Sequence, residues 1–196
     1  MSTHIVTEAA LDRMVSAVER VRDRLRHSTQ ILEHAAVPYA VVGDNAVSAW
    51  IASVDESAVR NTQKVELLVE TRDFVRVKDA LSAAGFVHRN VAGIDLFADD
   101  ATVRDWHSVR IVFAGEKVRP VDLYAAPDVT ESEQFGAMRV LSLEPLVKMQ
   151  LSMFRNNECV NLRDLIDVGL VDQSWTERLA PELAACLQEL IDDPDG

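Results

Sequence analysis

The sequence predicts a small α/β sheet with a long N-terminal helix and a C-terminal helical tail. Three observations support this fold class. Apolar residues between positions 7 and 36 recur at spacings of three and four, which is the period of an amphipathic helix. An apolar run at 39–42 and a strand-like segment at 64–69, with polar residues at alternate positions before an apolar run, are separated by one helix length, as in a small sheet with helical connections. From residue 142 onward the pattern is again helical.

The elements follow in order along the chain. We expect one or two helices over 7–36, ending before Pro38, and a first strand from Tyr39 to Val42. Gly43 permits a tight exit into a second helix, because glycine adopts backbone conformations that other residues avoid. The polar segment 53–62 is expected to form a loop.

The second strand, 64–69, leads into a third helix. Thr71 is the expected N-cap of this helix and Gly85 its stop signal. Extended segments are expected over 87–97, 108–113 and 121–124, an acidic loop over 127–136, and helices over 143–155, 160–171 and 181–191.

Composition limits the classes of partner. The formal net charge of −12 makes non-specific nucleic-acid binding unfavourable, because such binding neutralises phosphates with Lys and Arg. The first residues lack the features of a secretory signal, and no apolar run reaches ~18 residues. We therefore expect a cytoplasmic protein without a membrane span.

Two short segments contain the residues that point to chemistry. Gly43, Asp44 and Asn45 follow the first strand directly and begin a helix, and Lys64 and Glu66 lie two residues apart on the second strand. Side chains on a strand alternate between the two faces, so Lys64 and Glu66 point to the same side. A glycine turn, a helix and a strand with two polar positions resemble the active-site signature of the nucleotidyltransferase superfamily.

The C-terminal part extends this resemblance. The stretches 146–151 and 162–167 resemble the tail of the AbiEii toxin-like group, in which a Leu-x-x-Met-Lys-Leu helix precedes an Arg-Asp pair. The resemblance implies a nucleotidyltransferase-like small mixed sheet flanked by helices. It divides the chain into an N-terminal helical segment (1–36), a nucleotidyltransferase-like core (37–140) and a helical tail packed on that core (141–196).

The family chemistry implies a specific set of ligands. Two carboxylates on one strand and a third on a neighbouring strand hold two Mg²⁺ ions, which stabilise the attacking and leaving oxygens of nucleotidyl transfer. By resemblance, Gly43, Asp44 and Asn45 form the turn that faces a nucleoside triphosphate, whose phosphates bind the N-terminus of a helix. Gln150 and Arg163 occupy the tail positions expected to face the same phosphates.

The sequence departs from the family pattern at the metal site. Lys64 stands where the first metal-binding Asp belongs, and Glu66 stands where the second carboxylate belongs and is the predicted metal ligand. An ammonium repels a divalent cation, so we expect a Lys64–Glu66 ion pair in place of the metal. The alternative is that Lys64 contacts a phosphate directly and permits nucleotide binding without a metal.

The third carboxylate is also absent from its aligned position, which holds Arg110. Asp122 and Asp95 are the candidate replacements, since both lie in strand-like apolar surroundings. Each can equally be a solvent-facing residue without a role in metal binding, on a strand whose side chains alternate between the core and the solvent.

The sequence thus favours a nucleotidyltransferase-fold protein that lacks the full set of metal-binding carboxylates and retains nucleoside triphosphate binding. One alternative is an active enzyme that transfers a nucleoside monophosphate from Mg-NTP to a protein, RNA or small-molecule acceptor and acts as a toxin. Another is a module that binds a protein partner or a second copy of itself. Mg²⁺ and the triphosphate are cofactor and substrate only if the enzyme is active.

Overall fold

The structure is a computed structural model that describes residues 8–99 and 108–193, with side chains described from residue 16 onward. It begins with one long helix, α1 (Glu8–His34), in the region where the sequence permitted one helix or two. Residue 7 of the predicted helix lies outside the described residues. The chain leaves α1 through Ala36, which has a φ of +50°, and reaches the first strand by residue 40.

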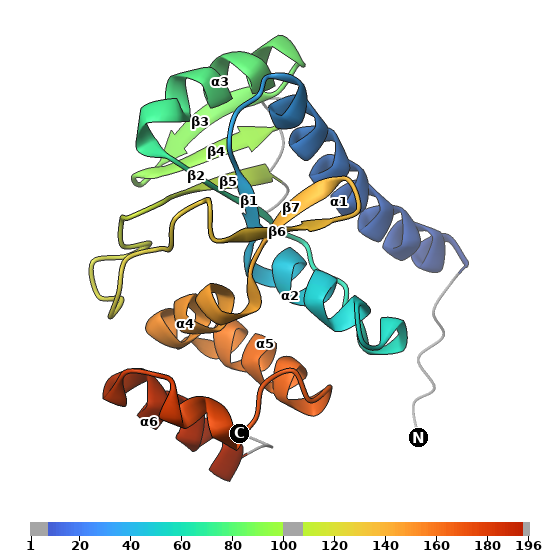
Figure 1. Cartoon of the computed structure of the whole chain (residues 1–196). Coiled ribbons are helices and arrows are strands. Elements are labelled where there is room, and N and C mark those ends of the chain that lie inside the picture. The colour runs from blue at the N-terminus through green and yellow to red at the C-terminus, as the bar shows by residue number, and fades with distance from the viewer. Residues whose placement is uncertain (1–7, 100–107, 194–196) are drawn as a thin grey trace.

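The described strands form one seven-stranded mixed sheet in the order β3-β4-β5-β2-β1-β7-β6 (Figure 1). The central strand β2 runs parallel to β5 and antiparallel to β1, and β1 runs parallel to β7. The bounds are β1 (Ala40–Val42), β2 (Val65–Val69), β3 (Val87–Val91), β4 (Ile94–Ala98), β5 (Ser108–Phe113), β6 (Ser132–Phe135) and β7 (Met138–Leu141). The predicted α/β class with a small mixed sheet flanked by helices is confirmed.

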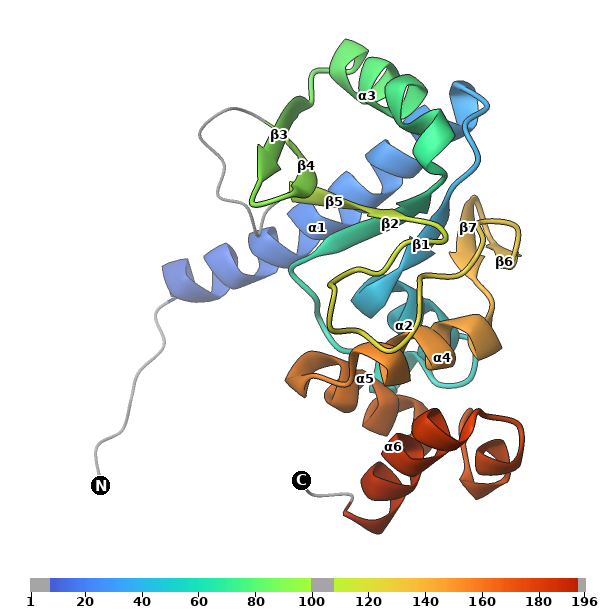
Figure 2. The same cartoon turned by 90° about the vertical axis from the view of Figure 1, so that its left-hand side faces the viewer.

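Helices cover the sheet and extend from it. α1 packs with α3 and contacts β2, β5 and β7, and it passes behind the sheet in Figure 2. α2 continues directly from β1, and it contacts α4 and α5 of the C-terminal part. The other helices are α2 (Gly43–Ala52), α3 (Phe74–Ala83), α4 (Leu143–Met153), α5 (Asn156–Asp167) and α6 (Pro181–Asp192).

One hydrophobic core joins the sheet to these helices. Leu67 of β2, Leu151 of α4 and Leu165 of α5 are each fully buried and belong to the same cluster. Burying a leucine side chain contributes roughly 1.5–3 kcal/mol. The elements that carry the polar site are therefore fixed to one another by apolar packing.

Three predicted extended or loop segments are different in the structure. The segment 87–97 is not one strand but a hairpin of β3 and β4. Residues 121–124 are not a strand: Val121 is 84% exposed, and the backbone bends there because the N–H of Arg119 donates to the Asp122 carboxylate. The predicted loop 127–136 contains β6, which forms a hairpin with β7. β6 is a polar edge strand without the apolar alternation by which strands are recognised, so only its pairing with β7 reveals it.

Several helix boundaries differ from the prediction. α4 ends at Met153 and not at residue 155, and α5 ends at Asp167 and not at residue 171. Thr71 does not cap α3 directly but starts a single 3₁₀ turn, Thr71–Asp73, that precedes the helix. α5 begins at Asn156 and not at residue 160. The prediction missed its first turn because that turn is polar and adds nothing to the helical periodicity of apolar residues. Among the described helices, none combines the length and the apolar character that crossing a membrane requires.

Candidate functional site

One row of side chains crosses the sheet at the predicted site. Val42 of β1 pairs with Glu66 of β2, Glu66 pairs with Arg110 of β5, and Arg110 pairs with Leu96 of β4. Residues in register on adjacent strands point to the same face of a sheet. The parallel pairing of β2 with β5 therefore places the Arg110 guanidinium beside the Glu66 carboxylate.

Gly43 lies directly against this row. Its φ is +64°, in the left-handed region that favours glycine, and a Cβ added to it would lie 2.1 Å from Oε2 of Glu66. The turn from β1 into α2 thus requires glycine for two reasons, its backbone conformation and the closeness of a carboxylate. The glycine of the predicted turn is therefore what lets Glu66 approach the N-terminus of α2.

Glu66 is the most perturbed group of the site. Its carboxylate accepts a hydrogen bond from Nη1 of Arg110 at 3.1 Å, and its side chain is 17% exposed. Burial raises the pKa of Glu66, the positive charges of Arg110 and Lys64 lower it, and the nearby Asp44 and Glu158 raise it further. The net direction is upward, so Glu66 holds its proton more tightly than an ordinary glutamate.

The predicted ion pair of Glu66 has a different partner. Arg110, and not Lys64, is the cation in contact with the Glu66 carboxylate. The reason is the register: Arg110 lies opposite Glu66 on the neighbouring strand, whereas Lys64 precedes β2. Nδ2 of Asn45 donates to the carbonyl oxygen of Lys64, and the Lys64 N–H donates to Oγ1 of Thr62 at 3.2 Å. These bonds position the Lys64 backbone and leave its ammonium at the cleft.

Asp44 joins α2 to the helical tail. Its two carboxylate oxygens accept from Oγ1 of Thr62 at 2.9 Å and from Nδ2 of Asn161 at 3.0 Å. The same Nδ2 donates to Oε1 of Gln150 at 3.2 Å. Asp44 therefore has defined partners on both sides, which explains an acid at a turn where the resembling family has Gly or Ser.

The start of α5 forms the opposite side of the site. Phe154 ends α4 with a φ of +39°, and α5 begins two residues later with no side-chain cap on its first N–H groups. Arg155, Asn156 and Asn157 at this start all line the same cleft as Glu66. Free N–H groups at a helix N-terminus attract anions.

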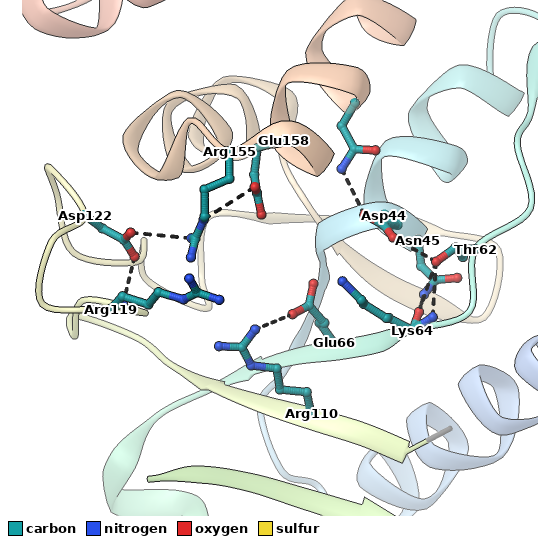
Figure 3. A network of polar contacts seen from close by, with 11 residues as sticks. Asp44, Asn45, Thr62, Lys64, Glu66, Arg110, Arg119, Asp122, Arg155 and Glu158 are labelled. Carbon is teal, nitrogen blue, oxygen red and sulfur yellow. Dashed lines mark hydrogen bonds and ion pairs between the residues drawn. The ribbon is translucent and has the colours of Figure 1, made fainter. Parts of the chain in front are cut away.

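Asp122 lies beneath this side of the site and is 3% exposed. It accepts from the backbone N–H of Arg119 at 2.8 Å and lies 3.4 Å from Nη2 of Arg155. Arg155 also lies 3.5 Å from Glu158. Asp122 thus contacts the backbone of Arg119 and the guanidinium of Arg155 at the edge of the cleft (Figure 3). It does not itself line the cleft.

These elements enclose a cleft of about 550 Å³. Lys64 and the side chains of Arg119 and Arg155 reach it from three different segments of the chain, as Figure 3 shows. The lining comprises Asp44, Lys64, Glu66, Arg110, Val112, Val118, Arg119, Met149, Met153, Phe154, Arg155, Asn156, Asn157 and Glu158.

Within the described part of the chain, some charged side chains of the cleft have a partner of opposite charge and others do not. The carboxylates of Glu66 and Glu158 each have an arginine partner. Among the described residues, by contrast, no carboxylate forms an ion pair with Lys64 or with Arg119. In a chain of net charge −12, two cations that contact no described carboxylate therefore face one cleft.

The residues present do not fit a two-metal site. Within 8–99 and 108–193, no group of three or more His, Cys, Asp or Glu side chains could hold a metal ion. Glu66 is paired with Arg110, and the Asp44 carboxylate is bonded to Thr62 and Asn161. These two acidic side chains of the cleft thus have protein partners where a metal site would need them free.

The remaining predicted positions lie elsewhere. Gln150 is 1% exposed and is bonded to Asn161 behind the cleft wall. Arg163 donates to the carbonyl oxygen of Asp193 at the end of the helical tail. Asp95 accepts from His88 at 2.7 Å on the β3–β4 hairpin. None of the three lines the cleft that holds Glu66.

The sequence reasoning missed the cations on the far side of the cleft. Arg119 lies in a loop without periodicity, and Arg155 precedes a helix whose first turn was not recognised. A usable signal was the polar run that follows Phe154, because a helix start rich in Asn commonly faces solvent or a ligand.

Comparison with solved structures gives the class of fold. The chain is similar to the antibiotic-resistance factor ANT(2″)-Ia, with 10% identity, coverage of 91% of this chain and 92% of that chain, and a TM-score of 0.53. It is also similar to an antigenic nucleotidyltransferase-like protein from Paracoccidioides brasiliensis, with 14% identity, coverage of 88% and 90%, and a TM-score of 0.50. Neither the protein-family models nor the curated proteins gave a match. The chain therefore has a nucleotidyltransferase-like fold.

Proposed function

We propose that this protein binds the phosphates of a nucleoside triphosphate without a metal ion and has lost two-metal nucleotidyl transfer. The observation that carries the proposal is the pair of cations, Lys64 and Arg119, which face one cleft and form no ion pair with any carboxylate in the part of the chain that the structure describes. Lys64 occupies the position at which the resembling family has its first metal-binding Asp. A basic side chain there takes over the charge that a metal would otherwise supply.

The shape of the cleft supports binding of a polyanion. Helix α5 begins at the cleft and has no side-chain cap on its first N–H groups, whereas the Glu66 carboxylate already lies against the start of α2. Arg155 adds a further guanidinium at the start of α5. Phosphate oxygens can accept from such groups and from Lys64 and Arg119 at the same time.

The acids of the cleft argue against the catalytic alternative. Mg²⁺ usually binds through one or two carboxylates together with substrate phosphates. Glu66 would first have to release Arg110, and burial already favours its protonated form. Arg110 itself stands at the position of the family's third carboxylate. We therefore propose binding rather than transfer.

The tail pattern supports a finer placement as an AbiEii-like protein with a degenerate motif. Leu146, Leu151, Leu162 and Leu165 of this pattern are fully buried where the tail packs. Its Arg163-Asp164 pair is used for structure, since Asp164 binds Arg60 at 3.1 Å.

Titration calorimetry with inorganic tripolyphosphate in EDTA tests the proposal. We expect measurable binding by the unaltered protein, and binding about tenfold weaker in Lys64→Met and in Arg119→Met, because each loses one charge-assisted contact. Lys78→Met is the matched control, since it removes the same charge from α3, which does not line the cleft.

Three outcomes would decide against the proposal. If tripolyphosphate does not bind in EDTA, the cleft is not a metal-free phosphate site and the proposal is wrong. Equal weakening by Lys78→Met would show a general effect of net charge. Binding that appears only when Mg²⁺ is added would favour the active enzyme, with Glu66 as metal ligand.

A further inference from the structure

A second cavity, of about 200 Å³, adjoins the basic cleft. The two share Lys64, Glu66 and Arg110, so these three side chains form the border between them. The other residues that line the second cavity are Val65, Val91, Ile94, Leu96 and Ser108. A ligand held at Lys64 can therefore extend into a compartment of opposite character.

Three of the four apolar residues that line this cavity are separate from the protein core, and the fourth, Val65, belongs to it. Leu96 is 7% exposed and Val91 is 37% exposed. Neither they nor Ile94 belong to the hydrophobic cluster that the described residues form, or to the side chains packed against it. These three side chains thus do not serve the packing that explains the other apolar residues of the sheet.

The register explains why they lie beside the polar row. Leu96 pairs with Arg110, and Val91 pairs with Ile94, which lies two residues from Leu96 on the same strand. Side chains two residues apart on a strand share a face. The three apolar side chains therefore continue the row of Glu66 and Arg110 toward the sheet edge at β3.

We propose that this apolar cavity holds the base of the nucleotide whose phosphates bind at Lys64 and Arg119. The inference rests on the proposed function, because it assumes that the basic cleft binds phosphate. The base is the part of a nucleotide with apolar faces, and a site for it must adjoin the phosphate site without being charged throughout. Val91, Ile94 and Leu96 supply such a surface, and they do so next to Lys64.

The β3 strand offers a matched pair of variants. Val91 and Val87 are the same residue on the same strand, both are 37% exposed, and both point to the same face because they are four residues apart. Only Val91 lines the cavity. Val91→Asn and Val87→Asn therefore make the same chemical change at equally exposed positions, and neither alters charge.

The experiment is calorimetric titration in EDTA with ATP, GTP, CTP, UTP and tripolyphosphate. We expect the tightest nucleotide to bind more strongly than tripolyphosphate, and Val91→Asn to weaken that nucleotide about fivefold. Val87→Asn should leave its affinity unchanged, and neither variant should alter tripolyphosphate binding. Ile94→Asn should reproduce the effect of Val91→Asn.

The outcomes separate this inference from the proposed function. If tripolyphosphate binds but Val91→Asn and Val87→Asn bind every nucleotide equally well, the base site is refuted and the phosphate site stands. If tripolyphosphate binds as tightly as each nucleotide, the base makes no contact and the inference is again refuted. If tripolyphosphate does not bind the unaltered protein, the proposed function fails and the inference fails with it.

Discussion

At the scale of single residues, the site depends on the contact between Gly43 and Glu66. A glutamate on a central strand is largely covered because the turn into α2 lies against its carboxylate, and this arrangement exists because residue 43 has no Cβ. Arg110 then supplies the opposite charge from the neighbouring strand. A glycine, an acid and a base thus occupy the region where the resembling family coordinates metal.

Replacing Gly43 by alanine tests this contact. Gly136 provides the comparison, because its φ of +57° is close to the +64° of Gly43 but no atom lies within 4 Å of an added Cβ. Gly136→Ala should lower the free energy of unfolding by about 1–2 kcal/mol through backbone strain alone. Gly43→Ala should cost about 2–4 kcal/mol, since the clash with Glu66 is added to the strain.

Urea denaturation of the two variants measures the difference. Equal losses of stability would mean that the Glu66 carboxylate moves aside at no cost and that the close approach does not constrain the site.

Because the pKa of Glu66 is raised, the stability of the protein should depend on pH. The folded chain keeps this proton above the ordinary pKa of 4.5, where the unfolded chain has lost it. Unfolding then releases a proton, so the contribution of Glu66 to the free energy of unfolding falls as the pH rises from about 4.5. Glu66→Gln cannot titrate.

We therefore expect the stability of the unaltered protein, relative to Glu66→Gln, to decrease as the pH rises above the ordinary glutamate pKa of 4.5. Urea denaturation at a series of pH values gives this difference. A difference that is constant, or that grows with pH, would contradict the raised pKa.

At the scale of elements, the cleft is assembled by the joint between α2 and α5. Asp44 at the start of α2 binds Asn161 in the middle of α5, and Asn161 also binds Gln150 of α4. This joint fixes the start of α5, with Arg155, opposite β2. The periodicity of apolar residues predicted the helices α4 and α5. It did not predict the first turn of α5, because that turn is polar and lines the cleft instead of packing in the core.

Asn161→Ala tests this joint. We expect a loss of about 1 kcal/mol in the free energy of unfolding, because Asp44 and Gln150 each lose a hydrogen bond. Asn157→Ala, on the same helix but exposed, should change stability by less than about 0.5 kcal/mol. Thermal or urea unfolding of both variants gives the comparison, and equal effects would show that the amide of Asn161 contributes nothing specific.

At the scale of the whole molecule, the local charge of the cleft opposes the charge of the chain. The formal net charge is −12, yet in the cleft four basic residues outnumber the three acidic ones, Asp44, Glu66 and Glu158. A small polyanion can reach the basic side chains inside the cleft, whereas an extended nucleic acid must also cross an acidic surface. The molecule as a whole thus favours a compact anionic ligand.

Sequence patterns predicted the α/β class and the position of the central strands because both depend on local periodicity. The turn at Gly43 and the polar position Glu66 also followed from the strand pattern. The partner of Glu66 did not, since it depends on the parallel pairing of β2 with β5, 44 residues apart in sequence. Arg119 was missed for a similar reason, because only the folded loop brings it to the cleft.

Thermal unfolding with each nucleoside triphosphate, once in EDTA and once with Mg²⁺, tests the central claim most directly. A ligand that binds only the folded state raises the free energy of unfolding by about 2.7 kcal/mol at ~100 times its dissociation constant. We expect stabilisation in EDTA that is at least as large as the stabilisation with Mg²⁺, and we expect it to be lost in Lys64→Met. Stabilisation that requires Mg²⁺ and disappears in Glu66→Gln would contradict the account and show that a metal site has survived.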